Sequence, residues 1–251
     1  MQDIEEYRKF ARERLGIEFN DINLLVTALT HRSYINEHKK AHESHNERLE
    51  FLGDAVLELV SSDFLYRNYH YPEGVMTAVR SALVRTEAIG VAGDELGYEP
   101  LIRLSKGEMK GTERAHDSIK ADCFEAVLGA VYLDQGYEAA KKIVYEHILD
   151  KIDEVLEEGT WRDAKSYMQE IVQKVDEETP TYRTLSEDGP DHDKHFEVGL
   201  YIGGQLRAKG EGHSKQDAQT EAARKVIRWY KQMAENDANL KAIIDEVSKI
   251  R

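Results

Sequence analysis

Three acidic residues recur at helical spacing in the segment from residue 46 to residue 66. Glu47, Glu50 and Asp54 stand at positions i, i+3 and i+7, so a helix places their carboxylates on one face. Like charges at this spacing destabilise a helix by roughly 0.2–0.5 kcal/mol per pair, and a divalent cation is the natural compensation. The alternative is a solvated acidic face, because such pairs are common on surface helices.

A second acidic pair lies inside the apolar run of residues 118–133. The run predicts a largely buried helix, yet it contains Asp122 and Glu125 at positions i and i+3. Buried carboxylates need partners. We therefore expect this pair to face Glu50 and Asp54 across a helix–helix contact, where the four carboxylates share magnesium.

Motifs around these acids resemble those of the ribonuclease III family. Residues 46–56 are similar to the family's signature, and Asp122-x-x-Glu125 matches its second acidic motif. The similarity covers about residues 5–232. Its other matching segments are Leu29-Thr30-His31-Arg32-Ser33-Tyr34, Glu73-Gly74 and Lys106-Gly107-Glu108.

The resemblance implies an endoribonuclease that cleaves double-stranded RNA. It implies hydrolysis with two magnesium ions, for which manganese substitutes, and 5′-phosphate and 3′-hydroxyl ends with a short 3′ overhang. It also implies a homodimer, because staggered cleavage of a duplex needs two sites related by a twofold axis. Processing of ribosomal and messenger RNA in the cytoplasm is the expected cellular role.

The resemblance also implies a role for individual residues. The implied metal ligands are Glu50, Asp54, Asp122 and Glu125. The implied catalytic residues are Asp54 and Glu125, and the implied supporting residues are Glu47, Glu73 and Glu108. Phe51 occupies the position that contacts the partner subunit, although a Phe between Leu49 and Leu52 is also compatible with ordinary core packing.

Helical periodicity extends over the first 158 residues. The expected helices cover residues 3–15, 20–29, 46–66, 75–84, 88–96, 118–135 and 137–156. Pro72, Gly97 and Gly136 interrupt the pattern between helices. The first domain is therefore expected to be an all-α bundle at residues 1–158, which positions both acidic pairs.

The periodicity changes from helical to alternating after a linker at residues 159–162. The expected elements are a helix at 163–174, strands at 182–185, 196–202 and 205–209, and a helix that begins after Ser214. Gly203-Gly204 predicts a two-residue hairpin turn. These features predict a small α+β domain of order α-β-β-β-α at residues 163–234, followed by a tail helix at residues 235–251.

The second domain resembles the double-stranded-RNA-binding domain, which implies duplex RNA as the partner. The implied contact residues are Ser166, Gln169, Glu170, His192 and Lys215. The residues Gly210-x-Gly212-x-Ser214-Lys215 lack the spacing of a phosphate-binding nucleotide loop, so no nucleotide cofactor is expected. Lys215 is the only cation at the start of this helix, where many relatives place several.

Charge and composition constrain the function less directly. The 251 residues carry 48 acidic and 34 basic side chains, for a net charge of −14, whereas nucleic-acid binders usually show a basic footprint. A few placed cations and bound magnesium resolve that conflict, because global charge sets solubility rather than specificity. No membrane span is expected, and the single Cys123 fits a reducing cytoplasm and an ordinary core position.

Some alternatives remain open from the sequence. His38, His42 and His45 fall at i, i+4 and i+7, so a zinc site is conceivable, although the segment lacks an apolar face to fix a helix. A duplex-RNA-binding protein that does not cleave, or an all-α interaction protein, are competing functions. The complete acidic quartet argues against the first of these, and the α-β-β-β-α domain argues against the second.

Overall fold

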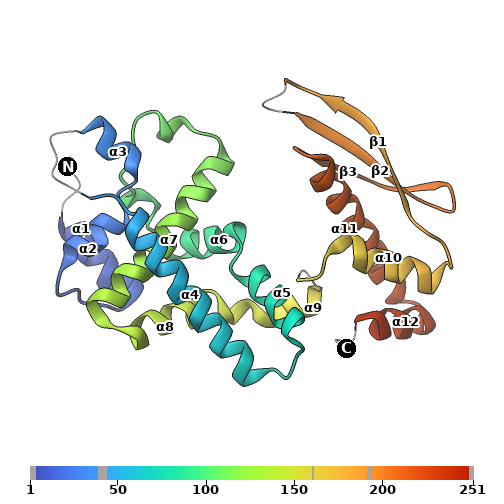
Figure 1. The fold of residues 1–251 in the computed structure, drawn as a ribbon, viewed down its shortest axis with the longest axis horizontal. Coiled ribbons are helices and arrows are strands. Elements are labelled where there is room, and N and C mark those ends of the chain that lie inside the picture. Colours follow the sequence, from blue (N-terminus) through green and yellow to red (C-terminus); the bar gives the residue numbers. More distant parts are fainter. Residues whose placement is uncertain (1–3, 39–43, 160, 191–193, 249–251) are drawn as a thin grey trace. The chain divides into compact units, whose positions relative to one another are not determined.

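The computed structural model describes residues 4–38, 44–159, 161–190 and 194–248 (Figure 1). Contacts between Cα atoms divide the chain into two compact units, Met1–Trp161 and Arg162–Arg251. The first unit is helical, and the second contains a three-stranded antiparallel sheet with helices. The fold class predicted from the sequence is confirmed.

The first unit is built from nine described α-helices and short single turns. The α-helices are α1 (Ile4–Phe10), α2 (Ile22–Ala28), α3 (Arg32–Glu37), α4 (Glu47–Asn68), α5 (Glu73–Leu83), α6 (Thr86–Leu96), α7 (Glu113–Gln135), α8 (Tyr137–His147) and α9 (Ile152–Glu158). The short turns are η1 (Ala11–Leu15), η2 (Glu99–Leu101), η3 (Glu108–Lys110) and η4 (Leu149–Lys151). The two longest helices, α4 and α7, form the most extensive helix pair of the unit.

Two expected helices are divided in the structure, whereas α7 begins five residues earlier than expected and α3 was not expected. The helix predicted over residues 3–15 changes to a π-helical turn at Ala11 and ends at Gly16, whose φ of 64° is in the left-handed region. The helix predicted over residues 137–156 divides at Ile148, a buried residue with φ −118° and ψ −52°. Helical spacing alone predicted one continuous element, because the apolar pattern persists on both sides of the break.

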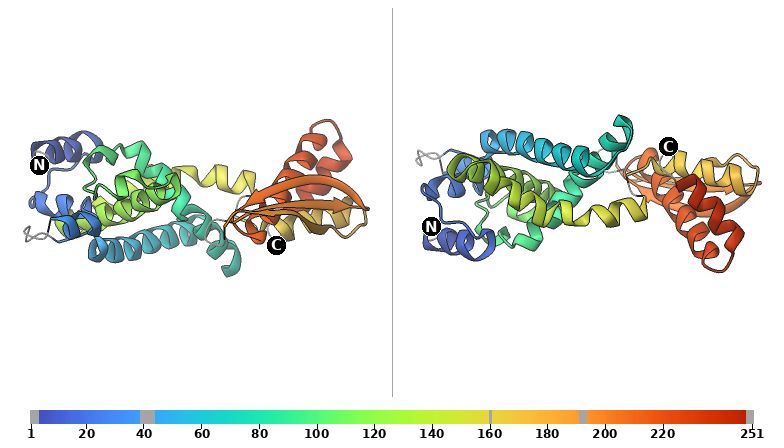
Figure 2. Two further views of the ribbon diagram at one scale, coloured as in Figure 1. Left: turned by 90° about the horizontal axis from the view of Figure 1, so that it is seen from above. Right: turned by 90° about the horizontal axis from the view of Figure 1, so that it is seen from below.

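The second unit has the order α10 (Ala164–Val175), β1 (Thr181–Asp188), β2 (His195–Ile202), β3 (Gln205–Gly212), α11 (Lys215–Ala234) and α12 (Ala238–Ser248). The strands pair antiparallel in the order β1-β2-β3. Gly203 and Gly204 form the two-residue turn with φ 56° and 76°, as type I′ geometry requires. Helices α10 and α11 cover the same face of the sheet, where Leu200 and Ile202 join the core (Figure 2).

Helix α12 is part of this second core. Leu240 and Ile244 are buried against α10 and α11. The Arg162 guanidinium donates hydrogen bonds to the carbonyl oxygens of Val247 (2.7 Å) and Ser248 (2.5 Å), the last carbonyls of the helix. The tail helix, whose role the sequence did not indicate, therefore fixes the start of the second unit.

Replacing Ile244 with Ala is expected to lower the free energy of unfolding of the second unit by about 2–4 kcal/mol, the usual cost of emptying a buried aliphatic position. Hydrogen exchange of the α10 and α11 amides measures this locally in the intact chain. Lys241→Ala, at an exposed position of the same helix, is the control and should leave exchange unchanged. Equal exchange in both variants would mean that α12 does not contribute to this core.

Among the described residues, no helix combines the length and the apolar character needed to cross a membrane.

Candidate active site and nucleic-acid interface

Two glycines allow α4 and α7 to cross almost in backbone contact. A Cβ atom built at Gly53 of α4 would lie 1.7 Å from the Glu125 carbonyl oxygen, and one at Gly129 of α7 would lie 2.3 Å from the Leu49 carbonyl oxygen. Real Cβ atoms essentially never come within 3.0 Å of another heavy atom, so only glycine fits at either position. The crossing places the acidic residues of the two helices side by side.

Charges act between the carboxylates of α4 and those of α7 at this crossing. Burial, followed by the charges of Asp54 and Glu50, raises the pKa of Glu125 to about 8. Burial, followed by the charge of Asp122, also raises the pKa of Glu50. Burial is the largest influence that raises the pKa of Asp122. Glu50, Asp122 and Glu125 are thus costly to ionise without a compensating cation.

The donor set has the chemistry of a hard-cation site. Four carboxylates, Glu50 and Asp54 from α4 with Asp122 and Glu125 from α7, supply the oxygen ligands that magnesium and manganese prefer. Within the part of the chain that the structure describes, no three His, Cys, Asp or Glu side chains converge closely enough to form a ready metal cluster. The fit therefore rests on the type of donor and on the mutual repulsion of the four groups.

Two of the three supporting residues lie near the quartet. The charge of Glu47, the first residue of α4, contributes to the raised pKa values of Glu50 and Asp122. The charge of Glu108, in η3, acts on His31 together with that of Asp122. Glu73 opens α5 and accepts a hydrogen bond from Thr77 Oγ1 (3.0 Å), a contact within its own helix that does not join it to the quartet.

His31 belongs to the same region, although the sequence gave it no role. It is the N-cap of α3, and its Nδ1 accepts a hydrogen bond from the Ser33 backbone N–H (3.3 Å). Burial lowers the pKa of His31, which favours the neutral ring, and the carboxylates of Glu108 and Asp122 oppose this shift. The same Nδ1 lies 2.8 Å from the Ser33 hydroxyl oxygen, within hydrogen-bond distance. His31 lies in the segment from Leu29 to Tyr34 that matches the family, and this match could have identified it from the sequence.

The conceivable zinc site is not assembled by the described histidines. His38 follows the end of α3, where its ring stacks on Tyr34 at 4.1 Å. His45 lies beyond that helix, with Nδ1 3.7 Å from a carboxylate oxygen of Glu47. His42 lies outside the described residues. The helix that would bring the histidines onto one face ends at Glu37, so His38 and His45 do not share a helix.

Cys123 is an inert core residue. Its side chain is fully buried, and burial raises the pKa of its thiol. The neighbouring polar contact is with Asn46, whose Nδ2 lies 3.8 Å from the Cys123 sulfur atom. The thiol therefore stays protonated and takes no part as a nucleophile.

Phe51 is not a core residue. Its side chain is 80% exposed on α4, and Leu59 (58%) and Tyr66 (75%) are exposed on the same helix. At 100° per residue, these three positions fall within about 80° of arc, so they form one apolar stripe along α4. The sequence was compatible with a core position for Phe51. The structure shows that Phe51 does not belong to the core of its own chain.

The predicted RNA-binding residues lie on α10 and at the start of α11. Ser166, Gln169 and Glu170 are exposed on α10, and Lys215 is the first residue of α11. Lys165 Nζ lies 3.4 Å from Gln219 Oε1, so the first turns of the two helices are joined. His192 lies outside the described residues. The structure thus brings the α10 and α11 contact regions to one end of the second unit.

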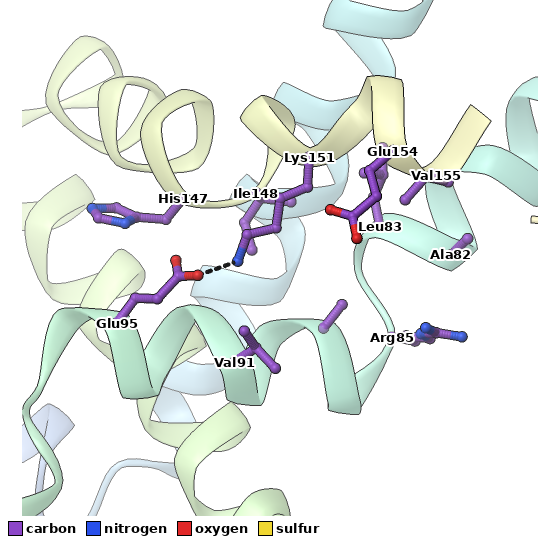
Figure 3. Close-up of a pocket in the computed structure, with 11 residues that line it drawn as sticks. Ala82, Leu83, Arg85, Val91, Glu95, His147, Ile148, Lys151, Glu154 and Val155 are labelled. Carbon is purple, nitrogen blue, oxygen red and sulfur yellow. Dashed lines mark hydrogen bonds and ion pairs between the residues drawn. The ribbon is translucent and has the colours of Figure 1, made fainter. Parts of the chain in front are cut away.

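A separate pocket of about 320 Å³ lies between α6 and the α8–α9 segment (Figure 3). Lys151 Nζ and Glu95 Oε1 form an ion pair of 2.8 Å across it, as the dashed line in Figure 3 marks. His147 and Val91 also line it. None of the predicted catalytic, metal-binding or RNA-binding residues lines this pocket.

Comparisons with known proteins agree with this architecture. Residues 21–152 match the family described as Ribonuclease-III-like, and residues 164–230 match the Double-stranded RNA binding motif. The chain is 43% identical over 217 residues to Ribonuclease 3 of Streptococcus gordonii, which covers 86% of this chain and 93% of that protein. It is 40% identical over 230 residues to Ribonuclease 3 of Lactiplantibacillus plantarum, covering 91% and 99%.

A solved structure resembles the first unit in fold and sequence. The nuclease domain of ribonuclease III from Campylobacter jejuni has a TM-score of 0.51 and 36% sequence identity, and the match covers 57% of this chain and 96% of that one. The report of that structure describes flexibility in a region involved in dimer formation.

Proposed function

This chain belongs to the ribonuclease III family, and from that premise we propose that it is a magnesium-dependent endoribonuclease that hydrolyses both strands of duplex RNA. The observation that carries the proposal is the α4–α7 crossing. It supports the proposal because the two helix backbones meet at Gly53 and Gly129, and because burial and neighbouring charges raise the pKa of Glu50 and of Glu125, carboxyl groups on opposite sides of that contact. A surface acidic face, the alternative from the sequence, would not be built around two glycines that only close helix contact requires.

Glu50, Asp54, Asp122 and Glu125 would hold two magnesium ions, and manganese would substitute because it prefers the same oxygen ligands. When bound, these ions would supply an activated water and neutralise the charge that develops on the phosphate and the leaving oxygen. Asp54 and Glu125 are the residues we place closest to the reaction. The close backbone contact at Gly53 would limit the movement of Asp54 and Glu125 relative to each other.

The second unit supplies binding of duplex RNA. The exposed α10 residues Ser166, Gln169 and Glu170 would face one minor groove, and Lys215 at the positive end of α11 would contact phosphates. We assign the β1–β2 connection, which includes His192, to the next minor groove. These contacts recognise the shape of the duplex rather than its sequence.

We further propose that the enzyme is a homodimer in which the apolar stripe of Phe51, Leu59 and Tyr66 contributes to the interface. Three large exposed apolar side chains on one helix face are typical of an interaction surface. The Campylobacter jejuni nuclease domain, described as having a region for dimer formation, is consistent with this assignment. Two sites related by a twofold axis would cut both strands and leave 5′-phosphate and 3′-hydroxyl ends with a short 3′ overhang.

Ribosomal and messenger RNA processing in the cytoplasm is the role that we propose.

The Phe51→Ala variant should weaken this dimer by about 2–4 kcal/mol, as is usual for a buried aromatic anchor at an interface. Analytical ultracentrifugation across nanomolar to micromolar protein measures the change. Leu133→Ala, which removes another exposed apolar side chain (55%) from α7, is the matched control and should leave association unchanged. A dimer of unchanged affinity in Phe51→Ala would remove this residue from the interface.

The proposed function is tested with the full chain and an end-labelled RNA duplex, with each separated strand as a control. Sizing of the products is expected to show cleavage of the duplex in magnesium, no cleavage in chelator, and recovery when excess magnesium is restored. The separated strands should remain intact. If the duplex is bound but is cut under none of these conditions, the protein binds RNA without cleaving it.

A further inference from the structure

One carboxylate in the second unit bridges two lysines at the predicted RNA-binding end. Glu187 of β1 lies 2.8 Å from Lys194 Nζ through one oxygen and 3.5 Å from Lys215 Nζ through the other. Lys194 belongs to the connection that precedes β2, and Lys215 opens α11. One carboxylate of the chain itself therefore pairs with lysines from two segments to which we assign contacts with RNA.

Neighbouring residues on β2 and α11 surround this ion-pair arrangement. Glu187 is the cross-strand partner of Phe196 on β2, and Lys215 Nζ lies 5.5 Å from the centroid of the Phe196 ring. Asp217, the acidic residue in the first turn of α11, accepts a hydrogen bond from Ser214 Oγ (2.8 Å) and is engaged in the helix cap. The hydrogen bond from Lys194, with the charge of both lysines, lowers the pKa of Glu187, so the group is a carboxylate at neutral pH.

Resting on the proposed binding of duplex RNA, we infer that Glu187 limits the affinity of this domain by competing with an RNA phosphate for Lys194 and Lys215. A phosphate that approaches these lysines meets a carboxylate already paired with them. Binding then exchanges one anion for another instead of adding a new ion pair. This competition should lower the affinity for RNA noticeably, because Lys215 is the only cation in the first turn of α11.

The inference predicts a change in salt dependence as well as in affinity. Each lysine–phosphate contact adds about 0.9 to the slope of log affinity against log salt on the B-DNA scale. Releasing Lys215 from Glu187 should therefore steepen the slope by up to about 0.9, and near 0.1 M salt it should tighten binding roughly three- to tenfold. Positioning of Lys215 by Glu187 would have the opposite sign, because removal of the carboxylate would then weaken binding.

The test compares variants of the full chain by fluorescence anisotropy with a labelled RNA duplex over a range of salt. All variants carry Glu125→Gln, and gels verify that the RNA stays intact. Glu187→Gln should bind more tightly with a steeper slope. Glu197→Gln is the matched control, since Glu197 is paired with Lys209 at 3.0 Å on the sheet and the charge change is identical. Adding Lys215→Ala to Glu187→Gln should remove most of the gain.

The outcomes separate this inference from the proposed function. If the Glu125→Gln parent binds duplex but Glu187→Gln binds no more tightly than Glu197→Gln, the competition by Glu187 is refuted while duplex binding stands. If the parent does not bind duplex at any salt concentration, the proposed function fails and the inference with it. Thermal melts of each variant establish that the domain is folded when binding is measured.

Discussion

Glu125→Gln is expected to abolish cleavage of duplex RNA while duplex binding remains nearly unchanged. The amide preserves the shape of the side chain but removes one negative charge from the quartet on the α4–α7 crossing. Loss of residues that merely orient a metal ligand typically costs 10–100-fold, so loss of a ligand charge should cost at least about 100-fold in kcat/KM. Cleavage rates and anisotropy on the same duplex measure both quantities.

The control for this variant is Glu146→Gln, which removes the same charge from an exposed position 3.7 Å from Lys142 on α8. It should cleave at the rate of the unaltered enzyme. Glu125→Gln should also unfold at a temperature no lower than the unaltered chain, because it relieves repulsion with Asp54 and Glu50. A cleavage rate within a few-fold of the unaltered enzyme would exclude Glu125 as an essential ligand.

Gly53→Ala should disable the enzyme without touching any carboxylate. The added methyl group would stand 1.7 Å from a backbone carbonyl oxygen of α7, so the two helices must separate. Such overpacking costs about 1–3 kcal/mol of stability, and a displacement of about 1 Å at a reacting centre can cost on the order of 100-fold in rate. Thermal melts and kcat/KM on duplex RNA are the measurements.

Gly74→Ala is the matched control, because a Cβ atom at that position of α5 meets nothing within 4 Å. It should retain activity and stability. Gly129→Ala should resemble Gly53→Ala, and the two together should cost less than the sum, since both changes break the same helix contact. Normal activity and melting temperature in Gly53→Ala would show that α4 and α7 do not meet at this point.

Local patterns explain what the sequence could predict. Helical and alternating periodicity gave the order of the longer elements but missed α3, and the spacing of Asp122 and Glu125 indicated an acidic pair on an otherwise buried helix, where the structure shows both residues half-buried. These are properties of neighbouring residues, so a single segment contains the signal. The family resemblance added the roles of the individual acids.

Features that depend on distant segments could not be predicted in this way. Nothing in the neighbouring sequence shows why Gly53 and Gly129 must be glycine, because the atoms that exclude a Cβ belong to the opposite helix. The exposure of Phe51 depends on which face of α4 meets α7, and apolar neighbours in sequence do not decide that. The contacts of Arg162 with Val247 and Ser248 close a segment of more than 80 residues, which no local pattern encodes.

The most direct test of the central claim is a manganese titration of the full chain, followed by the electron paramagnetic resonance signal of the free ion. If the α4–α7 crossing builds the divalent-cation site, the unaltered chain should bind manganese that magnesium displaces, and Glu125→Gln should lose that binding. Glu146→Gln, with the same net charge, should keep it. Equal manganese binding by both variants would contradict the account, because the ion would then be held by the acidic surface in general.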